Sequence, residues 1–183
     1  MRRHMKRKFL SILSVFLITI MLTSTVSAGG NIKLSGAFRL GSLIFDGTLT
    51  GVGGYTEGVT VTLTASGNPV VTCTNQGGSQ APGQNPPRVT ADGTQSIEPS
   101  DIDRRGRAAV SVETDDPVLT PKRAGCPNNR WTVTMVVFWT DAKVVVTDSN
   151  TGAPLLEQIY VCDPAQQTAT SVSCTLVSET SFH

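Results

Sequence analysis

The sequence predicts an all-β fold: an antiparallel β-sandwich of immunoglobulin-like or Greek-key type with about eight to ten strands. Three observations lead to this prediction. Apolar residues recur at every second position in short runs, threonine and valine dominate those runs, and clusters of glycine, proline, asparagine and aspartate separate them. A period of two is typical of strands with one buried face and one solvated face, and β-branched residues favour such strands.

The alternation can be followed along the chain from Asn31. We expect strands over residues 32–40, 43–49, 59–64, 107–113, 131–139 and 144–146. In the fifth of these runs Trp131, Val133, Met135, Val137 and Trp139 share one parity, so one buried face is expected to hold them. Residues 155–161 have no clear period, and the neighbouring strands favour β structure for them.

Turn residues fall where the alternation stops. Residues 51–58 hold four glycines, Ser66-Gly67-Asn68-Pro69 is typical of a tight connection, and Asp148-Ser149-Asn150-Thr151-Gly152 predicts a hairpin. Residues 75–87 contain no apolar side chain larger than proline, so we expect a loop without strand structure. Loops of about 12 residues or more in compact domains are often functional. A second irregular stretch is expected over residues 115–129.

The first 28 residues have the pattern of a secretory signal peptide. Five basic residues lie within residues 1–8, an apolar run follows from Phe9 to Leu22, and Val26-Ser27-Ala28 supplies small residues at a cleavage site. We therefore expect a leader over residues 1–28, cleaved after Ala28, and one β-sandwich domain over residues 29–183. The mature protein is expected outside the cytoplasm, either secreted or periplasmic.

Removal of the leader changes the charge balance. Five of the fifteen basic residues precede Ala28 and all fourteen acidic residues follow it, which leaves the mature chain with a net charge of −4. This charge argues against a nucleic-acid partner or a general anionic-membrane partner. No second apolar run approaches the roughly 20 residues of a spanning helix, so no membrane span is expected in the mature chain. The sequence does not fix an oligomeric state.

Four cysteines remain after cleavage, and an even number in an exported chain predicts two disulfides with three possible connectivities. Asp163-Pro164 opens a turn between Cys162 and Cys174, so the two strands of one hairpin are expected to bring this pair together. Cys73 and Cys126 are then left to join a strand end to a distant loop. The spacings do not match a zinc site or a redox dithiol.

Histidine is nearly absent from the mature chain, which has only His183. Ser-His-Asp or Cys-His catalysis therefore lacks its base, and we expect a protein that is not an enzyme. Asp101 and Asp103 lie beside arginines at an expected turn, where surface ion pairing accounts for them. Asp115 and Asp116 are adjacent and expected to be solvated. No cofactor is expected; calcium is the alternative, because loop carboxylates suit it, although no Asp-x-Asp-x-Asp-Gly loop is present.

Several motifs together resemble a family of small secreted bacterial β-rich proteins of unknown function. They are Thr72-Cys73-Thr74-Asn75, Gly77-Gly78, Pro82-Gly83-Gln84-Asn85-Pro86-Pro87, Gly125-Cys126-Pro127-Asn128 and Trp131. The resemblance covers roughly residues 31–146 and does not extend to Cys162 and Cys174. It implies that the first two cysteines and the Pro-Gly-Gln-Asn loop belong together, which supports the pairing of Cys73 with Cys126. It implies no activity.

These observations predict a non-catalytic structural or adhesive module of the cell envelope or extracellular space. The alternative is a carbohydrate- or ligand-binding module, with a cell-envelope glycan or protein as its partner. Its candidate ligand residues are the loop amides Gln76, Gln80, Gln84 and Asn85 and the aromatic residues Trp139 and Tyr55. Clustering of Trp139, Tyr55 and Tyr160 in an exposed groove would favour binding, whereas burial or scattering would favour a structural role.

Overall fold

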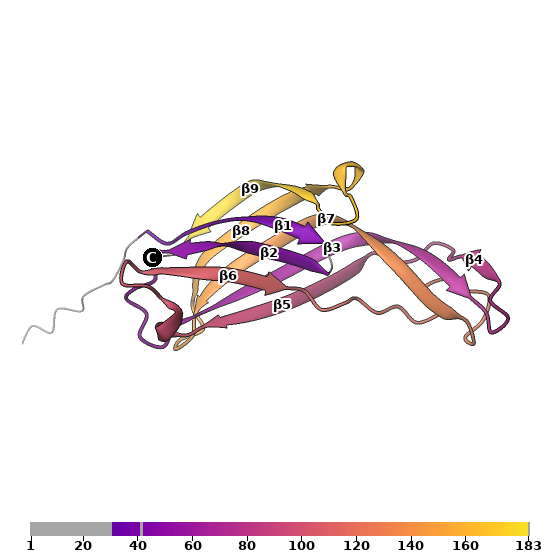
Figure 1. Cartoon of the computed structure of the whole chain (residues 1–183), viewed down its shortest axis with the longest axis horizontal. Coiled ribbons are helices and arrows are strands. Elements are labelled where there is room, and N and C mark those ends of the chain that lie inside the picture. Colours follow the sequence, from indigo (N-terminus) through magenta and orange to yellow (C-terminus); the bar gives the residue numbers. More distant parts are fainter. Residues whose placement is uncertain (1–30, 41, 183) are drawn as a thin grey trace, which may run out of the picture.

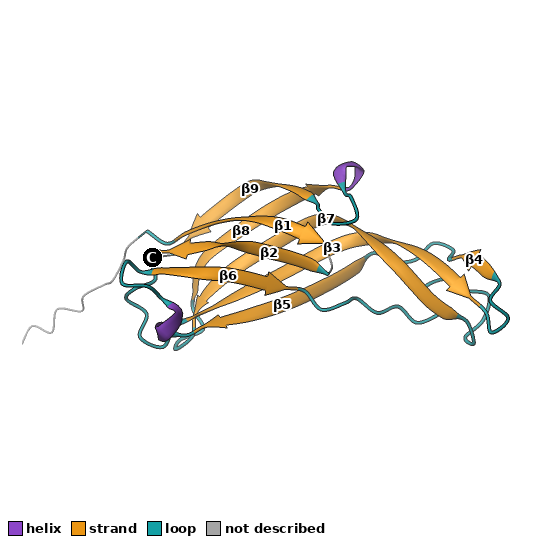
Figure 2. Cartoon of the chain, viewed as in Figure 1, coloured by secondary structure: helices purple, strands orange, loops and turns teal. Residues whose placement is uncertain are grey.

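The computed structural model describes residues 31–40 and 42–182 and confirms the predicted fold class (Figures 1 and 2). Nine strands form two antiparallel sheets, and two disulfides join Cys73 to Cys126 and Cys162 to Cys174. The predicted leader, residues 1–28, and His183 lie outside the described residues. Within the described part of the chain, no helix has the length and apolar character needed to cross a membrane.

The smaller sheet has the order β1-β2-β6 and the larger sheet has the order β4-β3-β7-β8-β9, with β5 also paired to β3. The strands of the smaller sheet are β1 (Lys33–Leu40), β2 (Leu43–Thr50) and β6 (Arg107–Glu113). Those of the larger sheet are β3 (Val59–Thr74), β4 (Gln80–Pro82), β5 (Val89–Ile97), β7 (Thr132–Asp148), β8 (Pro154–Asp163) and β9 (Ser173–Ser181). Two 3₁₀ turns complete the fold, η1 (Pro99–Asp101) and η2 (Pro164–Gln166).

The main core lies between the two sheets, where the alternating residues of each strand meet. Phe38, Phe45 and Tyr160 contact one another through their rings, with centroids 5.1 Å apart for the two phenylalanines and 4.9 Å apart for Phe38 and Tyr160. Both of these contacts are edge-to-face, which suits the quadrupoles of the rings. The parity predicted from the sequence therefore selects the buried face on both sheets.

Strands β3 and β7 are the longest in the molecule, at 16 and 17 residues, and their paired outer halves project beyond the sandwich (Figure 1). We call this projection the arm and define it as residues 67–89 and 117–139. A second, separate apolar cluster lies inside it, formed by Val71, Cys73, Val89, Leu119 and Ala124. The arm thus has its own small core and the Cys73–Cys126 disulfide.

The predicted turn at Ser66-Gly67-Asn68-Pro69 is wrong, because these residues lie inside β3. The pairing of β3 with β7 shifts between Ser66 and Gly67, so the glycine belongs to a bulge. A Cβ atom on Gly67 would lie 2.6 Å from the carbonyl oxygen of Phe138. Pro69 occupies the short stretch of β3 that neither β4 nor β5 pairs, so its missing N–H costs no hydrogen bond of the sheet.

Two further strands differ from the sequence prediction. The loop over residues 75–87 contains the short strand β4, which pairs with residues 72–74. Strand β5 was not predicted because Gly93 interrupts its alternation. A Cβ atom on Gly93 would lie 1.7 Å from the carbonyl oxygen of Glu113, so this glycine allows β5 to approach the end of β6. The ambiguous residues 155–161 are β structure, within β8, and the hairpin at residues 148–152 is confirmed.

Candidate functional site

The loop over residues 75–87 forms the tip of the arm and is held there by several contacts. The Cys73–Cys126 disulfide joins the end of β3 to the turn over residues 121–126. The amide of Gly83 donates to the carbonyl of Val71 at 2.9 Å, and the amide of Gln84 donates to the carbonyl of Gly125 at 3.3 Å. The loop and the turn therefore form one connected surface at the end of the arm.

Gly125 shows how closely these two segments approach. Its φ is +71°, and a Cβ atom there would lie 2.1 Å from the carbonyl oxygen of Gln84. A residue with a Cβ atom would meet both an unfavourable backbone conformation and a direct clash at this position. The association of the loop with the Gly125-Cys126-Pro127-Asn128 segment thus depends on a glycine as well as on the disulfide.

The four predicted loop amides belong to this loop at the end of the arm and are exposed. The residues are Gln76, Gln80, Gln84 and Asn85. Their side chains make no hydrogen bond to any other described residue, whereas the neighbouring Asn75 accepts a bond from the amide of Ser79 at 2.9 Å. The backbone of the loop is fixed while these four carboxamides face solvent, so their donors and acceptors are available to a ligand.

The predicted aromatic residues do not join the loop. Trp139 is only 2% exposed and lies at the base of the arm, and Tyr160 is 6% exposed in the sandwich core. Tyr55 is partly buried against the same core, and Trp131 is partly buried in the arm cluster. These side chains are buried or scattered, and the structure brings none of them into a stacking platform beside the amides.

The arm also carries a cationic surface that the sequence analysis did not find. Its charged residues are Arg88, Lys122, Arg123 and Arg130, and it contains no acidic residue. Arg88 pairs with Asp141 at the base of the arm. The other three are exposed and make no ion pair within the described part of the chain. The signal was present in the sequence as two acid-free stretches, residues 65–91 and 117–140, but they lie far apart along the chain.

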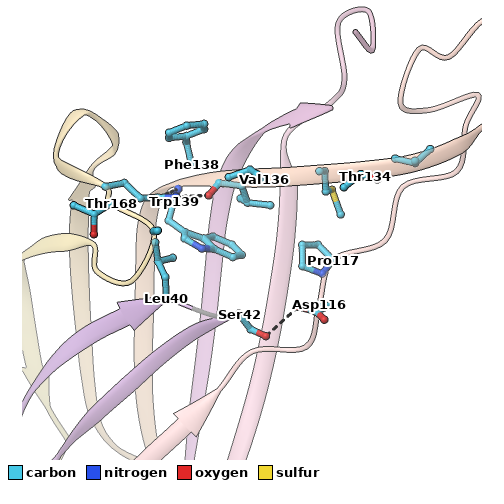
Figure 3. Close-up of a pocket in the computed structure, with 14 residues that line it drawn as sticks. Leu40, Ser42, Asp116, Pro117, Thr134, Val136, Phe138, Trp139 and Thr168 are labelled. Atoms are coloured by element: carbon cyan, nitrogen blue, oxygen red, sulfur yellow. Dashed lines mark hydrogen bonds between the residues drawn. The ribbon is translucent and has the colours of Figure 1, made fainter. Parts of the chain in front are cut away.

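A groove of about 820 Å³ lies at the base of the arm, under β7 (Figure 3). It is lined by Leu40, Ser42, Asp116, Pro117, residues 133–139 and residues 167–169. Its lining is mostly apolar, and the indole of Trp139 points into it, whereas the ring of Phe138 points away. The one charged side chain in this lining is Asp116, which accepts a hydrogen bond from the Ser42 hydroxyl at 3.0 Å.

Three of the four acidic residues weighed as catalytic or calcium-binding groups, Asp101, Asp103 and Asp116, have side-chain partners within the protein. Asp103 accepts hydrogen bonds from the backbone amides of Arg105 and Arg107 and pairs with the Arg107 guanidinium at 3.0 Å. The bond from the Arg107 amide is the main cause that lowers the pKa of Asp103. This arrangement confirms the predicted ion pairing for Asp103, whereas Asp101 instead accepts a hydrogen bond from the amide of Glu98 at 3.1 Å. Within residues 31–40 and 42–182, no three acidic, histidine or cysteine side chains gather in a way that would hold a metal.

Comparison of the chain with models of known protein families and with curated proteins finds no match.

Proposed function

We propose that this protein is an exported, non-catalytic adhesive module of the cell envelope or extracellular space, and that it contacts its target through the tip of the arm. The observation that carries the proposal is the tip surface itself. A loop fixed by a disulfide and by close backbone contacts presents four uncharged amides that bond to nothing else in the described structure, beside three exposed cations. Fixed backbone lowers the conformational entropy lost on binding.

The chemistry of this surface suits an anionic, hydroxyl-rich polymer such as a cell-envelope glycan. Carboxamides both donate to and accept from hydroxyl groups, and the cations attract phosphate or carboxylate groups. The described chain begins and ends at the opposite end of the molecule, as Figure 1 shows. The tip is therefore free to meet a target while the other end faces elsewhere.

The charge of the tip is tested by a matched pair of triple variants. Lys122→Gln/Arg123→Gln/Arg130→Gln removes three cations from the tip, and Lys33→Gln/Arg104→Gln/Arg105→Gln removes three exposed cations from the sandwich. We expect the tip variant to bind phosphate-bearing cell-wall glycan about tenfold more weakly at low salt, since each exposed charge contributes about 0.5 kcal/mol. The sandwich variant is expected to bind as the unmodified protein does. Equal loss in both variants would contradict the proposal.

The amides are tested separately from the charges. Gln76→Ala/Gln80→Ala/Gln84→Ala/Asn85→Gly keeps the cations, the disulfide and the backbone contacts, and glycine accepts the positive φ of 48° at position 85. We expect weaker binding to neutral and charged glycans alike with little change in melting temperature. A lower melting temperature with unchanged glycan binding would leave the loop a purely structural element.

A further inference from the structure

We propose that the groove under β7 binds an extended polypeptide segment of a partner protein, which adds as a strand to the free edge of β7. This site is separate from the tip of the arm and does not depend on the adhesive role proposed above. It follows from the backbone of β7, from one side chain that already occupies part of its edge, and from the side chains that line the groove.

The outer half of β7 pairs on one side only. Its register with β3 runs from Thr132 to Trp139, but its register with β8 begins at Asp141. The second edge of residues 132–138 therefore has no strand partner among the described residues. This stretch contains no charged residue and no proline, the devices that usually protect a free edge from pairing with another chain.

The side chain of Gln167 shows which backbone groups point to this edge. Its Nε2 donates to the carbonyl of Val137 at 2.6 Å, and its Oε1 accepts from the amide of Trp139 at 3.1 Å. The Gln167 carboxamide thus uses one donor and one acceptor at the position where an added strand would place a peptide group. The edge is occupied at that point by the nearest chemical equivalent of a polypeptide backbone.

Alternation along β7 places further unpaired groups on the same edge. Residues of one parity direct both backbone groups to one side of a strand, so Val133 and Met135 present their amides and carbonyls beside those of Val137. At about 3.4 Å per residue, these three residues offer an edge of about 14 Å, enough for a segment of four or five residues. Strand addition of this kind obtains affinity from the main chain and specificity from alternate side chains.

The residues that line the groove indicate which side chains the bound segment would carry. Trp139 points into the groove from β7, with Leu40 and Pro117 across from it (Figure 3). Met135 and Val137 also line the groove and share the parity of Trp139 along the strand. Alternate apolar side chains therefore fit the groove. Asp116 supplies one negative charge there, so a basic residue in the segment would be favoured.

The surroundings favour a single extended segment over the edge of a folded domain. Ser42 and Leu40, the stretch at residues 116–117 and the loop at residues 167–169 line the groove from different sides (Figure 3). A folded sheet would have to displace them, whereas one chain fits between them. A terminal or linker segment of a partner is thus the occupant.

The proposal is tested with the peptide acetyl-Val-Thr-Val-Thr-Val-Thr-Lys-amide, in which the lysine shares the inward-facing parity of the valines, and with two N-methylated forms of it. Binding is observed through the backbone amide resonances of the protein. Every strand pair in the described structure is antiparallel, and in that arrangement the inward-facing valines direct their N–H groups to β7. We expect the parent peptide to shift the amides of Val133, Met135 and Val137. Methylation of the valine nitrogens is expected to abolish binding, and methylation of the threonine nitrogens to preserve it.

A charge variant checks the orientation of the segment in the groove. Asp116→Asn keeps an acceptor for the Ser42 hydroxyl and is expected to weaken the lysine peptide about two- to fivefold, with no effect on a glutamine analogue. Equal effects of the two methylation patterns would overturn the proposal. So would the absence of shifts at the three amides with the peptide at millimolar concentration, or shifts confined to the tip of the arm.

Discussion

At the scale of single residues, a buried polar network connects the two sheets. Gln158 is 1% exposed, and its Nε2 donates to the carbonyl of Leu34 at 2.9 Å and to Glu179. Its Oε1 accepts from the Tyr160 hydroxyl at 2.7 Å. Each polar atom of the glutamine has a partner, so the network links β8 to β1 without a buried unsatisfied group.

This network predicts a dependence of stability on alkaline pH. Burial, aided by the negative charge of Glu179, raises the pKa of Tyr160 from 10.0 to about 12. The neutral phenol is favoured in the folded state, so its contribution is complete below pH 10 and is lost as pH rises from 10 to 12. We expect the free energy of unfolding to fall by about 1 kcal/mol between pH 8 and pH 11 through this group.

Tyr160→Phe isolates that contribution. The variant loses the hydrogen bond to Gln158, so we expect it to be about 1 kcal/mol less stable than the unmodified protein at pH 8. The gap between the two proteins should narrow by pH 11, because the phenylalanine cannot ionise. Urea unfolding at both pH values measures this. A gap that stays constant would assign the alkaline loss to other groups.

At the scale of elements, the sequence predicts the strands well and the arm poorly. The shared parity of Val133, Met135 and Val137 is visible from alternation alone, and it selects the inward face correctly. The continuation of β3 through Gly67 and Pro69 is not visible, because both residues normally mark turns. Their place in a strand depends on a bulge and on an unpaired gap between β4 and β5, which are properties of the sheet.

The candidate sites divide in the same way. The composition of residues 75–87 identifies the loop, and its amides are exposed as a ligand surface requires. The net charge of the sequence does not reveal the cations of the tip, because they come from two segments that are far apart along the chain. The groove cannot be predicted from the sequence either, because the free edge of β7 depends on where its pairing with β8 ends, at Asp141. No local pattern encodes that limit.

The two disulfides are expected to stabilise different elements. Cys73→Ala/Cys126→Ala removes a crosslink between residues 53 positions apart, and the loss of this crosslink is expected to lower the free energy of unfolding by about 4 kcal/mol through chain entropy. The effect should be largest in the arm, which has its own apolar cluster. We therefore expect faster amide exchange over residues 70–74 and 132–136, with exchange in the sandwich little changed. Hydrogen exchange observed by mass spectrometry measures both regions.

Cys162→Ala/Cys174→Ala serves as the matched control, since its closure of 12 residues joins β8 to β9 at the other sheet edge. This variant is expected to lower the free energy of unfolding by about 3 kcal/mol and to speed amide hydrogen exchange in β8 and β9, while the amides of the arm stay protected. Uniformly faster exchange in both variants would mean that the arm and the sandwich unfold as one unit.

At the scale of the whole molecule, charge is divided between the two ends. The arm holds four basic residues and no acid, while all fourteen acids lie elsewhere in the chain. The net charge of the chain therefore describes neither the basic arm nor the acidic sandwich. Such a division orients the molecule in the field of an anionic surface, with the tip of the arm toward it and the sandwich away from it.

The last prediction concerns the state of the exported chain. Disulfides form in oxidising compartments, and the two seen here agree with the leader predicted over residues 1–28. When the full sequence is expressed in a bacterium, we expect an exported product that begins at Gly29. Its intact mass should lie below that of the reduced chain by two pairs of hydrogen atoms, and alkylation without reductant should add nothing, since no free cysteine is present in the described structure. A product that retains Met1, or one that takes up alkylating reagent before reduction, would contradict this prediction.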